Sequence, residues 1–111
     1  MRKLVVLTLV CAQPLYADAE WRSLSGEAVR DALSGKRVQY ARAWQHFYAS
    51  GRTLYNAGQD SWGYWRIVDD RYCSMWPPSD LWACYDVQGA TTAVRFVGEG
   101  GEITEGVYVD D

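Results

Sequence analysis

The only histidine, His46, is the first residue to weigh as a catalyst. It could act as a general base, but such a base needs a nucleophile or a water molecule and an acid that orients it. The sequence contains neither a GxSxG nucleophile elbow nor an HExxH zinc motif. We therefore expect His46 to be a half-exposed strand residue and the protein not to be an enzyme.

Two further patterns could bind a cation or a phosphate group. Asp69-Asp70 is a carboxylate pair, but adjacent turn residues point apart and calcium loops need more oxygen ligands at defined spacing. Gly98-x-Gly100-Gly101 lies between expected strands, without a helix whose N-terminus could hold phosphate. Both patterns indicate turns. Because there is one histidine and no CxxC pair, we expect no metal site and no cofactor.

Four arginines fall on successive expected strands and could line an anion-binding pocket. Arginines in this arrangement more often lie on a solvated face or pair with acids across strands, as Arg71 and Asp86 would in the hairpin described below. The candidate anion-pairing residues are Arg52, Arg66, Arg71 and Arg95.

Large side chains on the strand faces that are expected to point away from the core form the candidate binding surface. Exposed aromatic residues mark interfaces and ligand grooves. The alternative is a second buried layer, packed against a helix or in a dimer. The residues are Trp44, Tyr48, Trp62, Tyr64, Met75 and Trp82.

A disulfide-bonded β-hairpin is predicted between Tyr72 and Tyr85. Pro77-Pro78 cannot continue a strand, and the arms beside it are rich in strand-forming residues. If Cys73 faces Cys84, a close cross-strand pair allows a disulfide and residues 77–80 form the loop. The same register pairs Tyr72 with Tyr85, Met75 with Trp82 and Trp76 with Leu81.

The first nineteen residues have the features of a secretory signal peptide. Arg2-Lys3 precedes an apolar run that is too short to anchor the chain in a membrane, and Ala17-Asp18-Ala19 resembles a cleavage site. Cleavage after Ala19 would leave one domain, residues 20–111, in the periplasm or the secreted fraction. It would also remove Cys11, so that Cys73 and Cys84 remain as an even pair, typical of a disulfide in an exported protein.

Charge argues against two classes of partner. Loss of Arg2, Lys3 and Asp18 changes the formal net charge from −3 to −4. Nucleic acids and anionic membranes attract basic surfaces. We expect no nucleic-acid partner and no stable membrane insertion after cleavage.

The remaining sequence predicts a mainly β fold. A short helix is expected near the N-terminus, with Ser25 as N-cap, Val29 and Leu33 on its buried face and Gly35 at its end. Turn signals then recur about every eight to twelve residues, as in all-β sandwiches and barrels, and every link between strands is short. We expect an antiparallel eight-strand meander that forms a small barrel or a strongly bent sheet. The strands are expected at residues 37–41, 44–48, 52–56, 62–68, 71–76, 81–87, 91–97 and 102–109.

Alternation along these strands predicts which side chains face the core. On the strand at 44–48 we expect Gln45 and Phe47 on the face opposite Trp44, His46 and Tyr48. On the hairpin and the strand before it, the residues expected to face the core are Trp65, Ile67, Tyr72, Trp76, Leu81, Ala83, Tyr85 and Val87.

Several segments together resemble a known family. They include Leu24-Ser25-Gly26, Gly51-Arg52-Thr53-Leu54-Tyr55, Tyr72-Cys73-Ser74-Met75-Trp76 and Trp82-Ala83-Cys84-Tyr85. The chain resembles a family of small exported proteobacterial proteins of unknown function. The resemblance implies an exported β protein and brings no activity with it.

These observations favour a small non-enzymatic periplasmic binding or interaction module with an aromatic-rich surface. Its partner would be a protein, a glycan or a small amphiphilic ligand, and a cavity inside a barrel would favour the small ligand. An alternative is an inhibitor of an extracytoplasmic hydrolase that inserts the loop at residues 77–80 into a cleft. A third hypothesis is an enzyme that uses His46.

Overall fold

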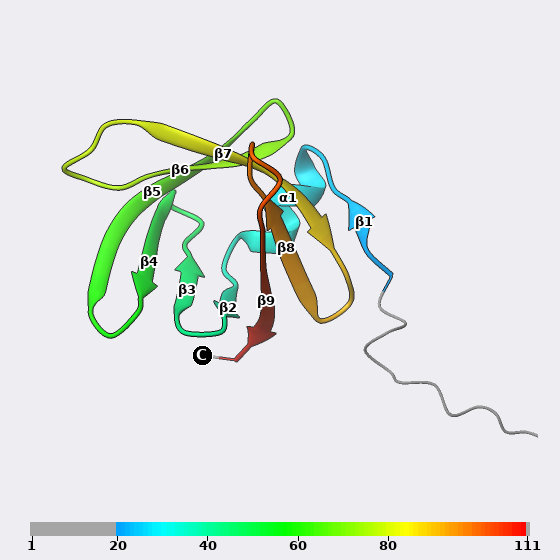
Figure 1. Cartoon of the computed structure of the whole chain (residues 1–111), viewed down its shortest axis with the longest axis horizontal. Coiled ribbons are helices and arrows are strands. Elements are labelled where there is room, and N and C mark those ends of the chain that lie inside the picture. The colour runs from blue at the N-terminus through cyan, green and yellow to red at the C-terminus, as the bar shows by residue number, and fades with distance from the viewer. Residues whose placement is uncertain (1–19, 111) are drawn as a thin grey trace, which may run out of the picture.

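The computed structural model describes residues 20–110 and shows an eight-stranded antiparallel β-barrel (Figure 1). Each strand from β2 to β8 pairs with the next one along the chain, and β9 returns to pair with β2. The predicted meander is confirmed, and it closes into a barrel. The predicted signal peptide lies outside the described residues. The strands are β2 (Arg37–Gln39), β3 (Trp44–Phe47), β4 (Arg52–Asn56), β5 (Asp60–Val68), β6 (Arg71–Met75), β7 (Trp82–Gly89), β8 (Ala93–Val97) and β9 (Ile103–Val109).

The chain enters the barrel through a short strand and a helix. The two-residue strand β1 (Arg22–Ser23), which the sequence did not predict, pairs with β7. The helix α1 (Glu27–Leu33) was predicted, as was the burial of Val29 and Leu33. The expected Ser25 N-cap is wrong. Gly26 occupies that position with φ 47° and no side-chain cap, and Ser25 instead accepts a hydrogen bond from the Ala28 amide through its backbone carbonyl.

Because strands of a meander run alternately up and down, successive turns lie at opposite ends of the barrel. The open end carries the β2–β3, β4–β5, β6–β7 and β8–β9 turns. The helix end carries the other three turns and α1, which Figure 1 shows behind β8. The Tyr108 hydroxyl of β9 donates a 2.8 Å hydrogen bond to the Ala32 carbonyl, and the helix buries Val29 and Leu33 in the core. The helix thus closes one end of the barrel.

Phe47 lies at the centre of the core and is fully buried. Its ring lies edge-on to Trp65 and Tyr72, with centroids 5.8 and 5.6 Å away, and 6.1 Å from Phe96. The inward positions predicted for Trp65 and Tyr72 are confirmed. The remaining buried members of this cluster are Val29, Leu33, Val38, Val87 and Val94.

The β6–β7 hairpin has the predicted register. Cys73 and Cys84 form a disulfide with their Cα atoms 4.0 Å apart, and Tyr72 and Met75 pair with Tyr85 and Trp82 respectively. The predicted Trp76–Leu81 pair is absent from this ladder, which ends at Met75 and Trp82.

The expectation that Leu81 and Ala83 belong to the core is wrong. Leu81 is 76% exposed, and Ala83 is exposed as well. Strand β7 pairs with β8 only from Asp86 onward, so Leu81 and Ala83 lie on the part of the hairpin that extends past β8. Side chains still alternate between the two faces of the strand at these positions, but the core no longer lies against either face.

The two patterns weighed as ion sites are turns, as predicted. Asp69 and Asp70 join β5 to β6, are exposed and have positive φ angles of 51° and 67°. Consecutive positive φ angles are typical of a tight hairpin turn, where aspartate is well tolerated. Gly98 and Gly101 lie in the β8–β9 turn, where the Gly101 amide donates to the Gly98 carbonyl.

Candidate functional site

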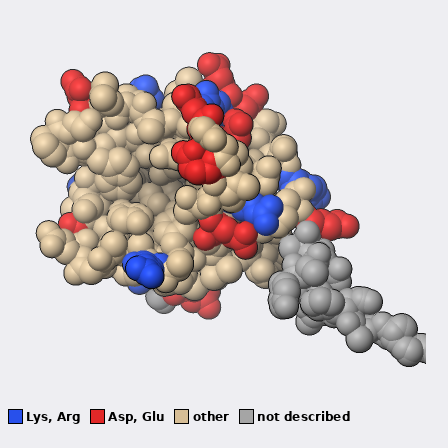
Figure 2. Space-filling view, in the orientation of Figure 1, with Lys and Arg blue, Asp and Glu red and all other residues tan. Residues whose placement is uncertain are grey.

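The open end of the barrel leads into a cavity of about 1040 Å³. In Figure 2 the surface is hollowed between the β6–β7 hairpin and strands β3 to β5, and the walls around the hollow are largely uncharged. Seven aromatic side chains line the cavity. Trp62 lies at the rim, and the other six have centroids of neighbouring rings 5.0 to 6.5 Å apart. These six are Tyr40, Tyr55, Tyr72, Trp76, Tyr85 and Phe96.

Two glycines leave room for the aromatic wall. A Cβ on Gly63 of β5 would lie 2.5 Å from the Trp76 ring, closer than van der Waals contact allows. A Cβ on Gly106 of β9 would lie 2.3 Å from Val38 and 3.0 Å from the Tyr40 ring. Both glycines are buried, so the rings occupy space that a side chain would otherwise fill.

The floor of the cavity is a polar network centred on Gln45. Its Oε1 accepts a 2.7 Å hydrogen bond from the Tyr40 hydroxyl, and its Nε2 donates to Thr53 Oγ1 at 2.9 Å and to the Tyr72 hydroxyl oxygen at 3.2 Å. Gln45 is 5% exposed, so these bonds satisfy a side chain that would be costly to bury alone. Beside this network, the Trp76 indole donates to Ser74 Oγ at 3.2 Å.

Burial raises the pKa of two phenols in the floor of the cavity. Loss of solvent raises the pKa of Tyr72 to about 12, partly offset by its hydrogen bonds with Ser74 and Gln45. Burial also raises the pKa of Tyr40 well above its usual value. Burial therefore disfavours ionisation of these two phenols still further, although a phenol of ordinary pKa is already neutral at physiological pH.

Two other tyrosines offer free polar groups higher in the cavity. Within residues 20–110, the hydroxyls of Tyr55 and Tyr85 have no hydrogen-bond partner, although both rings are half-buried. Charged side chains occur only near the rim, where Arg42, Asp60 and Glu105 contribute to the lining. The cavity is thus apolar inside, with a few hydroxyl groups and a charged entrance.

The predicted binding surface lies on the outer face of the barrel, and only Trp62 also reaches the cavity rim. Trp62 and Tyr64 are each 43% exposed. The other four residues are half-buried, so the surface is neither a fully buried layer nor fully exposed. Tyr64, Met75 and Trp82 are direct cross-strand neighbours on β5, β6 and β7, while Tyr48 stacks on Trp62 with centroids 5.8 Å apart.

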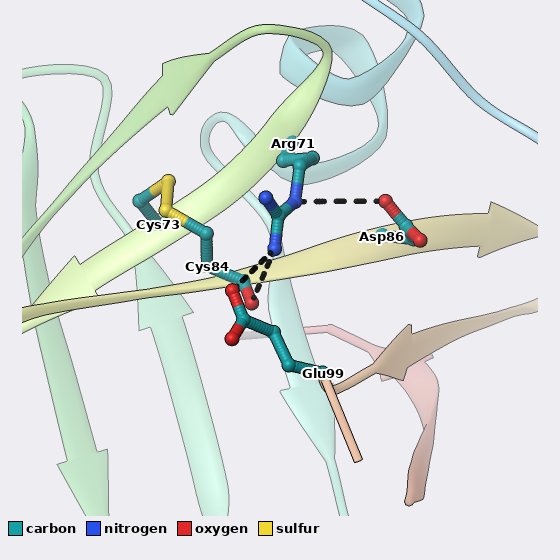
Figure 3. Close-up of polar contacts among 5 residues, drawn as sticks. All are labelled: Arg71, Cys73, Cys84, Asp86 and Glu99. Atoms are coloured by element: carbon teal, nitrogen blue, oxygen red, sulfur yellow. Dashed lines mark hydrogen bonds and ion pairs between the residues drawn. A yellow bond between two sulfur atoms is a disulfide. The ribbon is translucent and has the colours of Figure 1, made fainter. Parts of the chain in front are cut away.

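The four candidate arginines divide into two pairs. Arg71 lies 3.6 Å from Asp86, as predicted, and 3.1 Å from Glu99, and it donates to the Cys84 carbonyl at 3.3 Å. Figure 3 shows this guanidinium group between the two carboxylates, beside the disulfide. Arg95 pairs with Glu105 at 3.1 Å. Arg52 and Arg66 instead stack on tryptophans, so the four do not form one anion pocket.

His46 is a half-exposed residue of β3, as predicted; it lies on the outer face and stacks on Tyr48 with ring centroids 4.2 Å apart. It is not among the residues that line the cavity. Throughout the part of the chain that the structure describes, no group of three or more His, Cys, Asp or Glu side chains gathers to hold a metal ion. Between residues 20 and 110, no helix is long and apolar enough to span a membrane.

Sequence reasoning missed the cavity residues as a site. Most of them were expected to be core or were not singled out, because alternation shows which side a residue faces and not whether that side is filled. The available signal was polarity: Gln45 and Thr53 are polar residues at inward positions, which is unusual in a small core.

Comparison of the chain with family models, with curated proteins and with solved structures found no match. The resemblance to small exported proteins stays a prediction.

Proposed function

We propose that this protein is a non-enzymatic binding module that takes a small amphiphilic molecule into the open end of its barrel. The aromatic cavity between the rim and the core carries this proposal. Ligand sites are typically concave, about 300–1,000 Å³ in volume, mostly apolar and supplied with a few polar groups. The cavity of about 1040 Å³ is slightly above the top of that range and has this composition.

The lining favours a flat or aromatic body with a small number of hydrogen-bonding groups. Tyrosine and tryptophan rings gain from offset or edge-on contacts with another ring, about 0.5–1.5 kcal/mol for each pair. The hydroxyls of Tyr55 and Tyr85 can donate to a ligand or accept from it. A charged group would remain at the rim near Arg42 and Asp60, because the deeper wall offers it no partner.

The positions of the reactive side chains support a binding role over catalysis. His46 lies on the outer face of β3, and the charged residues of the cavity lie at its entrance. The Cys73–Cys84 disulfide fits an oxidising compartment such as the periplasm, where the predicted signal peptide would direct the chain.

A fluorescence titration with N-phenyl-1-naphthylamine, a neutral aromatic probe that brightens in apolar sites, tests the proposal. The wild-type protein should show one saturable site. The Tyr85→Ala variant, which removes a wall of the cavity, should bind at least about tenfold more weakly, a loss of about 1.4 kcal/mol. Tyr64→Ala is the matched control, because it removes a tyrosine from the outer face.

A variant at the cavity rim tests whether weaker binding of the probe comes from a blocked site or from a damaged fold. Ala57 is exposed and lines the cavity entrance, so Ala57→Trp adds bulk there without removing a core residue. It should also weaken binding of the probe. Equal binding by wild type, Tyr85→Ala and Ala57→Trp would refute a site at the open end.

One observation favours inhibition of a hydrolase as a second candidate. The β6–β7 tip carries an apolar side chain, Leu81, that is 76% exposed on a hairpin held by a disulfide. An exposed apolar side chain on a loop that a disulfide holds rigid could insert into the cleft of a hydrolase. Purified protein in molar excess should then inhibit a lysozyme or a serine protease, and Leu81→Asp should abolish inhibition. Unchanged activity across a panel of both enzyme classes would argue against this candidate.

A further inference from the structure

Two exposed arginines on the outer face of the barrel have guanidinium groups without a protein acceptor. The side chains of Arg52 on β4 and Arg66 on β5 form no ion pair or hydrogen bond with any residue from 20 to 110. Arg71 and Arg95, by contrast, already hold carboxylates. The donors of Arg52 and Arg66 are therefore available to a ligand.

Stacking on aromatic rings fixes the orientation of both groups. The Arg52 guanidinium carbon lies 4.4 Å from the centroid of the Trp62 ring and 6.0 Å from that of Tyr64. The Arg66 carbon lies 3.8 Å from the centroid of the Trp82 ring. A stacked guanidinium keeps its in-plane N–H groups free for bidentate bonds to carboxylate, sulfate or phosphate, and loses less entropy when it forms them.

The arginines are part of an extended surface, which we call the outer strip: Trp44, Tyr48, Arg52, Trp62, Tyr64, Arg66, Met75 and Trp82. It crosses strands β3 to β7, and strands about 4.8 Å apart give it a width of roughly 19 Å. Trp62 and Tyr64 leave 43% of their surface exposed beside Arg52. A single small anion would cover only part of this surface, so the strip suits a long ligand with repeated anionic groups.

We propose that the outer strip binds an acidic polysaccharide. Its carboxylate or sulfate groups accept hydrogen bonds from Arg52 and Arg66, and the C–H faces of its sugar rings lie against the exposed parts of Trp62 and Tyr64. This site shares only Trp62 with the rim of the cavity, and neither arginine lines the cavity.

Other polyanions fit the surface less well. Duplex DNA carries one phosphate charge for about every 1.7 Å of its length and is bound by strongly basic domains, whereas two arginines suit a polyanion whose charges are more widely spaced. Anionic membranes attract clusters of four to eight basic residues, whereas the strip has two arginines whose donors are available on a convex barrel wall. The experiment below distinguishes nucleic acids and anionic membranes from an acidic polysaccharide.

Calorimetric titration of the mature protein with polygalacturonate tests this proposal, with dextran sulfate as the sulfated probe and neutral dextran as the uncharged control. Wild type should bind at least one acidic polymer but not neutral dextran, and binding should weaken between about 50 and 200 mM salt. The double variant Arg52→Gln/Arg66→Gln should bind at least about tenfold more weakly, because each arginine contributes charged hydrogen bonds. Arg95→Gln, whose arginine already holds Glu105, is the matched control and should bind like wild type.

Two more variants keep the result interpretable. Arg52→Lys/Arg66→Lys retains the charge but loses the stacked planar fork, and should bind with intermediate affinity. Tyr85→Ala should bind the polymer like wild type even if the cavity proposal fails. No binding by wild type, equal losses in Arg95→Gln and the double glutamine variant, or tighter binding to single-stranded DNA or anionic vesicles would overturn the proposal.

Discussion

At the scale of single residues, the open end of the barrel depends both on a glycine without a side chain and on a glutamine that forms several hydrogen bonds. Gly63 supplies no side chain, and the Trp76 ring occupies the space beside it. Gln45 supplies both a donor and an acceptor, and so connects Tyr40, Thr53 and Tyr72 in one buried network. The cavity therefore depends on residues that a hydrophobic pattern alone does not distinguish.

Replacement of Gly63 should disturb the cavity wall. In Gly63→Ala the new methyl group would meet the Trp76 ring at 2.5 Å and the Met75 carbonyl oxygen at 2.7 Å, so ring or backbone must move. Overpacking of this kind typically costs about 1–3 kcal/mol of unfolding free energy. Urea denaturation should detect it, whereas Ser61→Ala, two residues away on the same face, should change stability by less than about 0.5 kcal/mol. Equal stability of both variants and wild type would contradict the close packing.

The buried phenol of Tyr72 should make stability fall at alkaline pH. Its pKa is about 12 in the folded protein, against a usual value of 10.0. Between these pH values the unfolded chain loses the proton while the folded protein keeps it, so the stabilisation present below pH 10 is lost as pH rises. The slope from this group is at most about 1.4 kcal/mol per pH unit. Urea denaturation from pH 9 to 11.5 should show a shallower decline for Tyr72→Phe, and an unchanged slope would exclude the effect.

At the scale of elements, the β6–β7 hairpin was the most predictable part of the chain. Two cysteines, a Pro-Pro pair and flanking aromatic residues all required the same register, and Cys73 does face Cys84. The prediction was wrong where the hairpin extends past its neighbours, at Leu81 and Ala83, because local alternation carries no information about what lies opposite. For the same reason α1 was predicted from its own residues, whereas the pairing of β1 with β7 was not.

Removal of the disulfide should weaken the hairpin without destroying the barrel. The bond links residues 11 apart in the sequence, and bridges of this loop size stabilise by about 2–4 kcal/mol, mainly by restricting the unfolded chain. The Cys73→Ser/Cys84→Ser variant should lose a few kcal/mol in urea denaturation and keep its far-ultraviolet circular dichroism spectrum. Peptide mapping of exported wild-type protein without reductant should recover the two cysteines in one linked peptide pair. Free thiols in that material would contradict the assignment.

At the scale of the whole molecule, the barrel has two unlike ends and two unlike surfaces. The helix fills one end, and the other end opens into an aromatic cavity. The outer face combines stacked arginines with half-exposed rings. The number and order of strands followed from turn signals along the chain. The cavity could not be predicted from the sequence, nor could the division of the four arginines into two that form ion pairs and two that stack on tryptophans. Both depend on which strands become neighbours when the barrel closes and on how far each strand extends.

The central claim is that a small amphiphile enters the open end. Two indole groups report on the two ends: the N–H of half-buried Trp76 donates to Ser74 beside the cavity, and the N–H of buried Trp65 donates to the Tyr48 carbonyl near the helix end. The most direct test is to follow ¹⁵N-labelled tryptophan resonances by NMR during titration with N-phenyl-1-naphthylamine. We predict that the Trp76 indole resonance shifts in a saturable manner while the Trp65 resonance stays in place. Movement confined to the outer-face Trp62 and Trp82, with Trp76 unchanged, would contradict binding in the barrel.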